Sequence, residues 1–216
     1  MKKSIITLAV LATLSSAGAF AADAGDMILR AGLTTVAPDE TSSNVTLDGA
    51  ATGLFLNVDN NTQLGLNFAY FLTDNINIEV LAATPFTHDM GIDGVGPLGS
   101  TKHLPPTVTA NYYFADASSA FQPYAGVGLN YTIFFDEEFT AANKEAGFSD
   151  LDADASFGLS AQVGFDYNID KEWLVNASVR YIDISTDASF KLNGADGAVT
   201  LDIDPWVYTV SVGYKF

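Results

Sequence analysis

The carboxy-terminal eleven residues alternate between apolar and polar positions with a period of two. This is the period of a β-strand and not of a helix. About ten residues is also the length that a tilted strand needs to cross the hydrocarbon layer of a bilayer. The segment therefore predicts a strand with one apolar and one polar face. The apolar set is Trp206, Tyr208, Val210, Val212, Tyr214 and Phe216.

The same alternation recurs in seven further segments, so the chain is predicted to form eight strands. They are residues 27–36, 63–72, 76–83, 107–114, 124–133, 157–167, 173–181 and 206–216. Three connections are short, and the four near residues 37–60, 84–106, 134–156 and 182–205 are each roughly twenty residues long. Short and long connections alternate, as in outer-membrane barrels with short periplasmic turns and long outside loops.

The opposite parity carries the charged residues Arg30, Glu79, Arg180 and Lys215. Such side chains are costly in lipid but fit a polar lumen, whereas a soluble lipocalin-like barrel would turn its apolar face inward. An open sheet edge cannot be satisfied in hydrocarbon, so the first and last strands are expected to pair. The predicted fold is all-β: an eight-stranded antiparallel up-and-down transmembrane β-barrel with short periplasmic turns and four long extracellular loops.

The amino-terminus has the features of an export signal. Lys2 and Lys3 precede an apolar run, and Ala19-Phe20-Ala21 forms a small-x-small cleavage site. We therefore expect residues 1–21 to be a cleaved signal peptide and residues 22–216 to be one outer-membrane barrel domain. No cysteine is present, which excludes disulfides, thiolate metal sites and a cysteine nucleophile.

Composition supports a membrane protein and argues against binding of nucleic acid. Hydrophobic residues make up 48% of the chain and charged residues only 16%, whereas soluble domains carry about 25% charged residues. The formal net charge of −17 repels nucleic acid.

Two groups of residues are candidates for a functional site. Eight strands enclose a lumen only just wide enough for side chains, so Arg30, Glu79, Arg180 and Lys215 are expected to form a polar plug. The outer loops and strand ends hold an excess of apolar residues, which either pack the loops together or form a funnel for hydrophobic molecules. The funnel candidates are Leu54, Phe55, Leu56, Phe134, Phe157 and Trp206.

Catalysis is not expected. The only histidines, His88 and His103, lie in or beside the second long connection, and no serine nucleophile motif accompanies them. The acidic outer segments lack the glycine and terminal glutamate of a calcium loop. We predict no catalytic residues, no bound metal and no cofactor.

Several motifs fall in a recognisable order along the whole mature chain. The runs LAATPF at 81–86, KHLPPT at 102–107, DASS at 116–119, PYAGVGLNYT at 123–132, WLVN at 173–176 and DPW at 204–206 resemble the outer membrane protein W family. This resemblance implies an eight-stranded barrel in the outer membrane of a Gram-negative bacterium. It also implies passage of small hydrophobic compounds and recognition by toxins or phage.

Two functions follow as hypotheses. In the first, the barrel is a narrow passage for small hydrophobic molecules, which leave sideways into the membrane near Pro85, Pro105 and Pro106, because proline supplies no donor to the ladder. The alternative is a non-conducting structural or receptor barrel whose loops bind toxins, phage or host surfaces. Expected partners are outer-membrane lipid, lipopolysaccharide, small hydrophobic solutes and the assembly machinery that reads the carboxy-terminal Phe216.

Overall fold

The computed structural model describes residues 22–116 and 118–216. The predicted signal peptide, residues 1–21, lies outside the described residues. The described chain is built from strands, with one short helix, α1, at Ala141–Glu145. Among the described residues, no helix has the length and apolarity needed to cross a bilayer.

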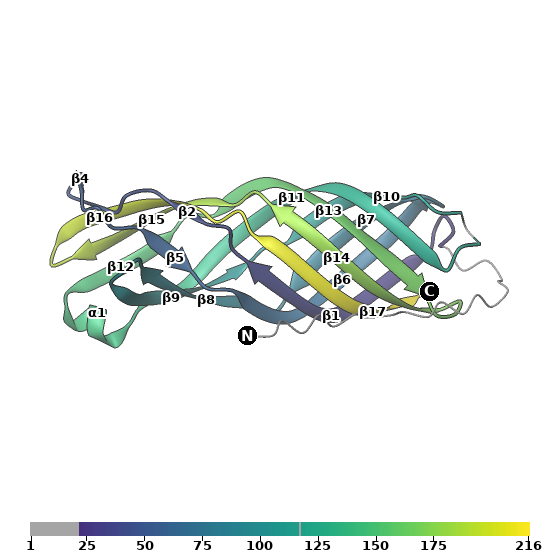
Figure 1. Cartoon of the computed structure of the whole chain (residues 1–216), viewed down its shortest axis with the longest axis horizontal. Coiled ribbons are helices and arrows are strands. Elements are labelled where there is room, and N and C mark those ends of the chain that lie inside the picture. Colours follow the sequence, from purple (N-terminus) through teal and green to yellow (C-terminus); the bar gives the residue numbers. More distant parts are fainter. Residues whose placement is uncertain (1–21, 117) are drawn as a thin grey trace, which may run out of the picture.

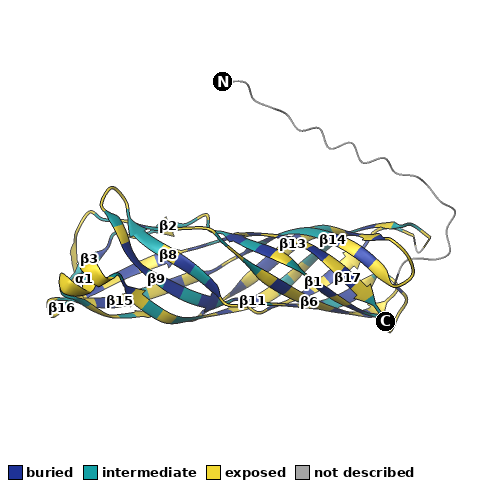
Figure 2. Cartoon of the chain, turned by 90° about the horizontal axis from the view of Figure 1, so that it is seen from below, coloured by how far each residue is buried: buried dark blue, intermediate teal, exposed yellow. Residues whose placement is uncertain are grey.

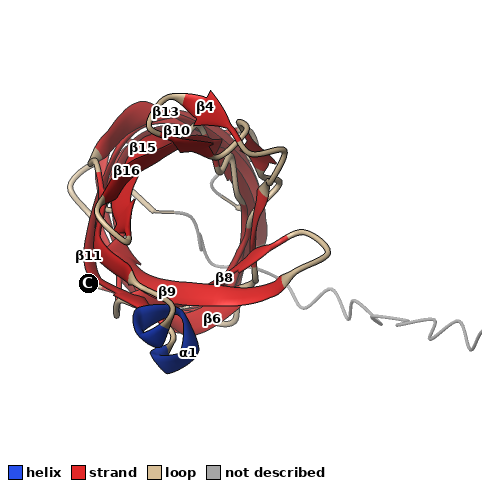
Figure 3. Cartoon of the chain, turned by 90° about the vertical axis from the view of Figure 1, so that its left-hand side faces the viewer, coloured by secondary structure: helices blue, strands red, loops and turns tan. Residues whose placement is uncertain are grey.

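Eight strands form a closed antiparallel barrel, seen end-on in Figure 3. Around the ring, each strand pairs with two neighbours, and β1 pairs with β17 from Ile28 opposite Lys215 to Ala37 opposite Trp206. The predicted eight-stranded barrel with paired first and last strands is therefore confirmed. The strands are β1 (Met27–Ala37), β6 (Asn61–Thr73), β7 (Ile76–Ala83), β10 (Thr107–Tyr113), β11 (Phe121–Phe139), β13 (Ser156–Asn168), β14 (Trp173–Ile182) and β17 (Trp206–Lys215).

The two ends of the barrel differ. The carboxy-terminus and the short turns lie at one end, on the right of Figure 1, and the long connections extend the barrel at the other end. The turn between β6 and β7 spans only residues 74–75, and that between β13 and β14 spans residues 169–172. The predicted alternation of short and long connections is confirmed.

The four long connections contain strands that the alternation pattern did not predict. Strands β8 (Phe86–Ile92) and β9 (Gly96–Leu104) form a hairpin, as do β15 (Ser185–Leu192) and β16 (Ala195–Asp202). Strand β11 continues past the barrel wall and pairs with β9. The remaining short strands are β2 (Thr41–Ser42), β3 (Thr46–Leu47), β4 (Ala50–Ala51), β5 (Leu56–Val58) and β12 (Phe148–Ala153).

Apolar side chains cover the outer wall of the barrel, and most of the side chains inside it are polar. Val127 and Val210 are 69% and 68% exposed, whereas Thr34 and Asn111 on the inward parity are buried. Exposed and buried residues alternate along the strands in Figure 2. This arrangement is the reverse of a soluble barrel and matches a wall that contacts lipid.

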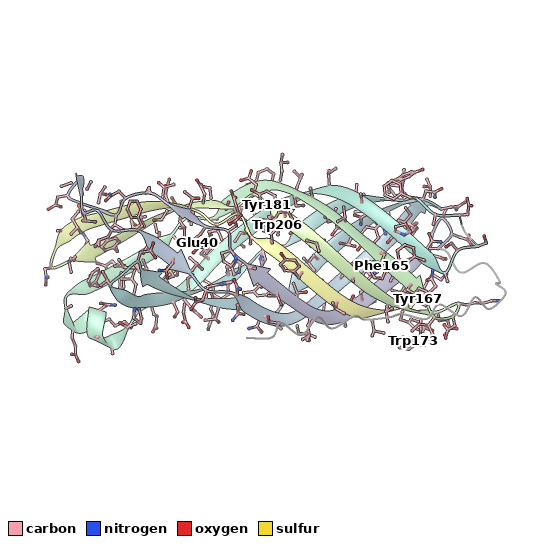
Figure 4. All side chains as sticks on the ribbon, in the orientation of Figure 1. Glu40, Phe165, Tyr167, Trp173, Tyr181 and Trp206 are labelled. Carbon is pink, nitrogen blue, oxygen red and sulfur yellow. The ribbon has the colours of Figure 1, made fainter. Side chains whose placement is uncertain are left out.

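Aromatic side chains mark two levels of the outer wall. Trp206 pairs with Tyr181, with ring centroids 5.5 Å apart, and Trp173 pairs with Tyr214 at 5.1 Å. Figure 4 shows Trp206 and Tyr181 together, and Trp173 nearer the turn end of the barrel. Eight positions of β17 separate the two levels, roughly 20 Å along the axis of a tilted strand, which approximates an apolar band flanked by aromatic girdles.

Candidate functional site: an apolar cavity above a polar network

Inward-facing side chains change from polar to apolar where the strands leave the membrane region. Among the inward-facing residues of β1, the polar Thr34 precedes the apolar Val36. On the antiparallel strand β17, the apolar Val207 precedes the polar Thr209, and all four side chains are buried. Val36 and Val207 belong to an apolar cluster that continues into the outer extension. The lumen is therefore polar in the middle of the barrel and apolar in the outer extension, and a second apolar cluster that includes Ile28, Phe71 and Leu174 lies at the turn end.

The apolar outer part encloses a cavity of about 110 Å³. An apolar cavity of ~150 Å³ holds one benzene-sized molecule, so this space suits a small ring or a short chain. Its wall comes from the long connections after β1, β7, β11 and β14. The lining apolar residues are Pro38, Val45, Leu47, Leu54, Leu56, Val58, Met90, Ile92, Leu98, Phe134, Phe148, Leu151, Ala153, Ala188, Phe190, Leu192, Val199, Leu201 and Ile203.

The predicted funnel residues divide into two sets. Leu54, Leu56 and Phe134 line the cavity. Phe157 and Trp206 are 68% and 42% exposed on the outward parity of β13 and β17, so their prediction as lining residues was wrong. Phe55 is also exposed and does not line the cavity.

Sequence reasoning missed the β15–β16 hairpin as a wall of the cavity. Ala188, Phe190 and Leu192 alternate along β15, and Val199 and Leu201 alternate along β16. The same two-residue period that identified the barrel strands was present there. It was overlooked because the whole segment was interpreted as a loop.

Two buried histidines, His88 and His103, lie in the cavity wall. His88 Nδ1 lies 2.5 Å from the Asp59 carbonyl oxygen, and His88 Nε2 lies 3.0 Å from His103 Nε2. Both rings lie on β8 and β9, beyond the membrane-crossing strands. Burial lowers the pKa of His88, and burial together with His88 lowers the pKa of His103 to about 3. Both rings are therefore neutral near pH 7.

A network of charges fills the lumen below the cavity. Arg180 Nη2 lies 2.6 Å from Glu79 Oε1, and Glu79 Oε2 lies 3.3 Å from Arg30 Nη1. Strands β7 and β14 are four positions apart in the ring of eight, so the Arg180–Glu79 pair spans opposite walls. The connection crosses the full width of the barrel.

Arg30 joins a second carboxylate to this network. Its Nε and Nη2 donate to Asp166 Oδ1 and Oδ2 at 3.2 and 2.6 Å, a two-point contact. Tyr113 donates to Asp166 Oδ2 at 2.9 Å, and Gln162 Nε2 donates to Glu79 Oε1 at 3.1 Å. Two guanidinium groups thus face two carboxylates, and the buried charges balance.

The structure brings together three of the four residues predicted to form a polar plug. Arg30, Glu79 and Arg180 meet in one network, whereas Lys215 lies nearer the turn end, with Nζ 4.0 Å from Asp26 Oδ2. Asp166 was missed, although it lies on the inward parity of β13. The alternation predicts whether a side chain faces the lumen or the lipid. It does not predict which side chain of the opposite wall that residue contacts.

Gly213 makes room for one of these large polar side chains. It lies opposite Arg30 in the β1–β17 register, and a Cβ there would lie 2.6 Å from Leu174 Cδ1 and 3.0 Å from Arg30 Cγ. A larger residue at this position would crowd Leu174 and the aliphatic part of Arg30.

Backbone pairing is interrupted on one side of the outer wall. Strand β7 ends at Ala83, the Thr84 N–H donates to the Leu64 carbonyl at 3.1 Å, and Pro85 follows. In the described part of the chain, β6 and β8 form no ladder, and pairing resumes in the same register where the Asp59 N–H donates to the Asp89 carbonyl and β5 pairs with β8. On the neighbouring strand, Pro105 and Pro106 separate β9 from β10.

The closed ring of eight strands, its apolar outer wall, its aromatic levels and its polar lumen define a β-barrel protein of the bacterial outer membrane. The chain belongs to the OmpW family, whose model matches residues 23–216. It is 51% identical over 222 residues to outer membrane protein W of Vibrio cholerae and 49% identical over 216 residues to that of Escherichia coli, each match covering 100% of both chains.

A solved structure shows the same fold. The crystal structure of the outer membrane protein OprG from Pseudomonas aeruginosa aligns with a TM-score of 0.89 at 44% identity, covering 92% of this chain and 99% of that one. These relatives are named as outer membrane proteins and carry no enzymatic name.

Proposed function

We propose that the barrel admits small hydrophobic molecules from outside and releases them sideways into the outer leaflet of the membrane. The observation that carries this proposal is the apolar cavity directly above a lumen filled by charged side chains. An apolar molecule in the cavity would have to lose its apolar contacts and disrupt buried ion pairs to move straight down. The path through the wall avoids both costs.

The unpaired stretch between β6 and β8 is the proposed exit. Pro85 has no N–H to donate, and Phe86 and His88 follow it beside the cavity. The wall has no strand ladder between the Thr84–Leu64 and Asp59–Asp89 hydrogen bonds, so a gap that opens there breaks few backbone hydrogen bonds. One relative is consistent with apolar cargo: a protein from Pseudomonas aeruginosa, 28% identical over 191 residues, is named a dibenzothiophene metabolism operon protein.

The test measures the entry of naphthalene into cells that express the chain in place of their own family member. Entry should be several-fold faster than in cells with an empty vector. Ala188→Trp fills the cavity and should return entry to the vector level, whereas Ala110→Trp, the same change on the lipid-facing wall, should not.

The second function, a closed receptor barrel, predicts a different result. If the folded barrel in the outer membrane leaves naphthalene entry at the vector level, the passage is refuted. The extracellular hairpins would then be tested for binding of toxins, phage or host surfaces.

A further inference from the structure

The lipid-facing wall has a groove where strands β11, β13 and β14 lie side by side. The groove has a volume of about 610 Å³, and it lies over the backbone of Gly128 and Ser160, which occupy inward-facing positions. Ala161 lies between Val127 on β11 and Tyr181 on β14 in one row across the three strands. Because the Ala161 side chain is a single methyl group, the wall is hollow at the centre of this row.

The sides of the groove are apolar and open to the membrane. Val127, Leu129 and Leu159 line it, and each of these side chains is more than half exposed. Leu129 lies opposite Leu159 in the next row, one step nearer the outer extension. Residues at these positions contact lipid in a membrane barrel. The groove is therefore accessible to the hydrocarbon chains of the surrounding lipid.

The outer end of the groove reaches the level of the lipid head groups. Tyr181 lies opposite Trp206 at the outer aromatic level (Figure 4). Aromatic side chains of this kind mark the boundary between hydrocarbon and head groups. Asp183 lies two residues further out and lines the groove, and its N–H donates to the Leu159 carbonyl at 2.9 Å. The groove thus has an apolar body within the outer leaflet and a charged end at its surface.

This end of the groove is acidic. The carboxylates of Asp39, Asp183 and Asp204 all lie near the Tyr181 hydroxyl. Asp204 is held there because its Oδ1 accepts the Ile184 N–H at 3.1 Å. Within the described part of the chain, none of the three carboxylates forms an ion pair with a basic side chain. The local charge therefore repels anionic head groups and attracts cationic ones.

We propose that the groove binds one acyl chain of a phospholipid whose head group ends in an ammonium group. The chain fills the hollow over Ala161, and the ammonium lies beside Asp183. Phosphatidylethanolamine is the class that fits, and it is preferred over phosphatidylglycerol, whose chains are the same but whose head group carries no positive charge. Strand β13 is four places from β6 in the ring of eight, so this site lies opposite the proposed exit and is independent of the proposed passage.

Trp206 is a natural reporter for the experiment. The chain has two tryptophans, so Trp173→Phe leaves only the one that lies opposite Tyr181. This chain is folded into phosphatidylcholine vesicles that contain a minor fraction of phosphatidylethanolamine or phosphatidylglycerol, brominated near the head-group end of the acyl chain. Bromine quenches tryptophan fluorescence at short range. The relative binding constant of phosphatidylethanolamine should be about fivefold higher, as expected for one charge contact at a membrane surface.

Four variants, each made in the Trp173→Phe chain, locate the site. Ala161→Phe fills the groove and should bring the ratio of the two binding constants close to one. Ala31→Phe makes the same change at an exposed lipid-facing position of β1 and should keep the ratio. Asp183→Asn removes one carboxylate, leaves the groove intact and should lower the ratio. Asp196→Asn removes an exposed carboxylate from the outer end of the β15–β16 hairpin and should keep it.

Each contrary result overturns part of the assignment. Equal quenching by the two lipids would refute the preference for an ammonium group. A preference for phosphatidylglycerol that depends on Mg²⁺ would refute it too, because a metal cation would then bridge the carboxylates and the phosphate. A ratio that survives in Ala161→Phe would show that the groove is not the site. Asp183→Asn tests the charge even where Ala161→Phe fails to fold, and naphthalene entry through the barrel is unaffected by any of these outcomes.

Discussion

Arg180 and Glu79 meet across the whole width of the barrel, with the guanidinium Nη2 2.6 Å from the carboxylate Oε1 and both side chains almost fully buried. The two residues lie on strands that are four places apart in the ring. The pair therefore ties opposite walls together in addition to closing the lumen.

Removal of the Glu79 charge should destabilise the barrel strongly. Glu79→Gln leaves Arg180 and Arg30 facing the single carboxylate of Asp166, and breaking a buried pair typically costs about 3–5 kcal/mol. The free energy of unfolding in urea, measured in lipid vesicles, checks this. Lys191→Gln is the control, since its pair with Asp196 is exposed to water and should contribute far less to the free energy of unfolding. Equal losses in both variants would contradict the account.

A charge introduced on the lipid-facing wall should destabilise the barrel far more than a charge introduced at an equally exposed position outside the membrane. Val210 and Val95 are 68% and 69% exposed, but Val210 lies in β17 and Val95 lies in the turn of the β8–β9 hairpin. Val210→Arg should cost roughly 2–4 kcal/mol at mid-membrane. Val95→Arg should stay within about 0.5 kcal/mol, as surface substitutions do. Similar urea midpoints for the two variants would show that β17 does not face lipid.

The alternation of residues was sufficient to predict the barrel but not every contact inside it. It placed Arg30, Glu79 and Arg180 on the inward parity, because the period of a strand fixes its two faces. The same rule puts Trp206 on the parity of Val210, so its assignment to an inner funnel conflicted with the pattern. The partner of Arg30 could not be predicted from the sequence. The level of Asp166 along the barrel axis depends on how far β13 is shifted relative to β1, and the sequence of a single strand does not determine that shift.

Closing the proposed exit should slow the entry of hydrophobic solutes. The register of β6 with β7, continued past Pro85, places Thr87 opposite Asn61. A disulfide between cysteines at these positions should reduce naphthalene entry several-fold, and a reductant should restore it. The chain has no cysteine of its own, so the bridge is the only one that forms.

A second bridge controls for stiffening of the barrel. Leu33→Cys with Val210→Cys joins β1 to β17 where the ladder is already complete. Entry through this variant should be the same with and without reductant. If the β6–β8 bridge leaves entry unchanged, solutes leave the cavity by another path.

The two buried histidines should make the outer extension less stable as the pH falls. The pKa of His103 is lowered to about 3 in the folded chain by burial and by His88, against an ordinary value near 6.5. Above pH 6.5 both folded and unfolded states are neutral at this ring. Between about pH 6.5 and 3 the unfolded state takes up a proton that the folded state does not, so stability declines by up to ~1.4 kcal/mol per pH unit.

Hydrogen exchange of the β8–β9 hairpin between pH 7.5 and 5 measures this effect, after correction for the intrinsic dependence of exchange on pH. The unchanged chain should lose protection as the pH falls, and His103→Phe should lose less, because its ring cannot bind a proton. The acidic residues of the outer hairpins are the same in the unchanged chain and in His103→Phe, so their contribution to the pH dependence is removed when the two are compared. A His103 resonance that titrates near pH 6.5 would mean that the ring is open to water, and it would contradict the prediction.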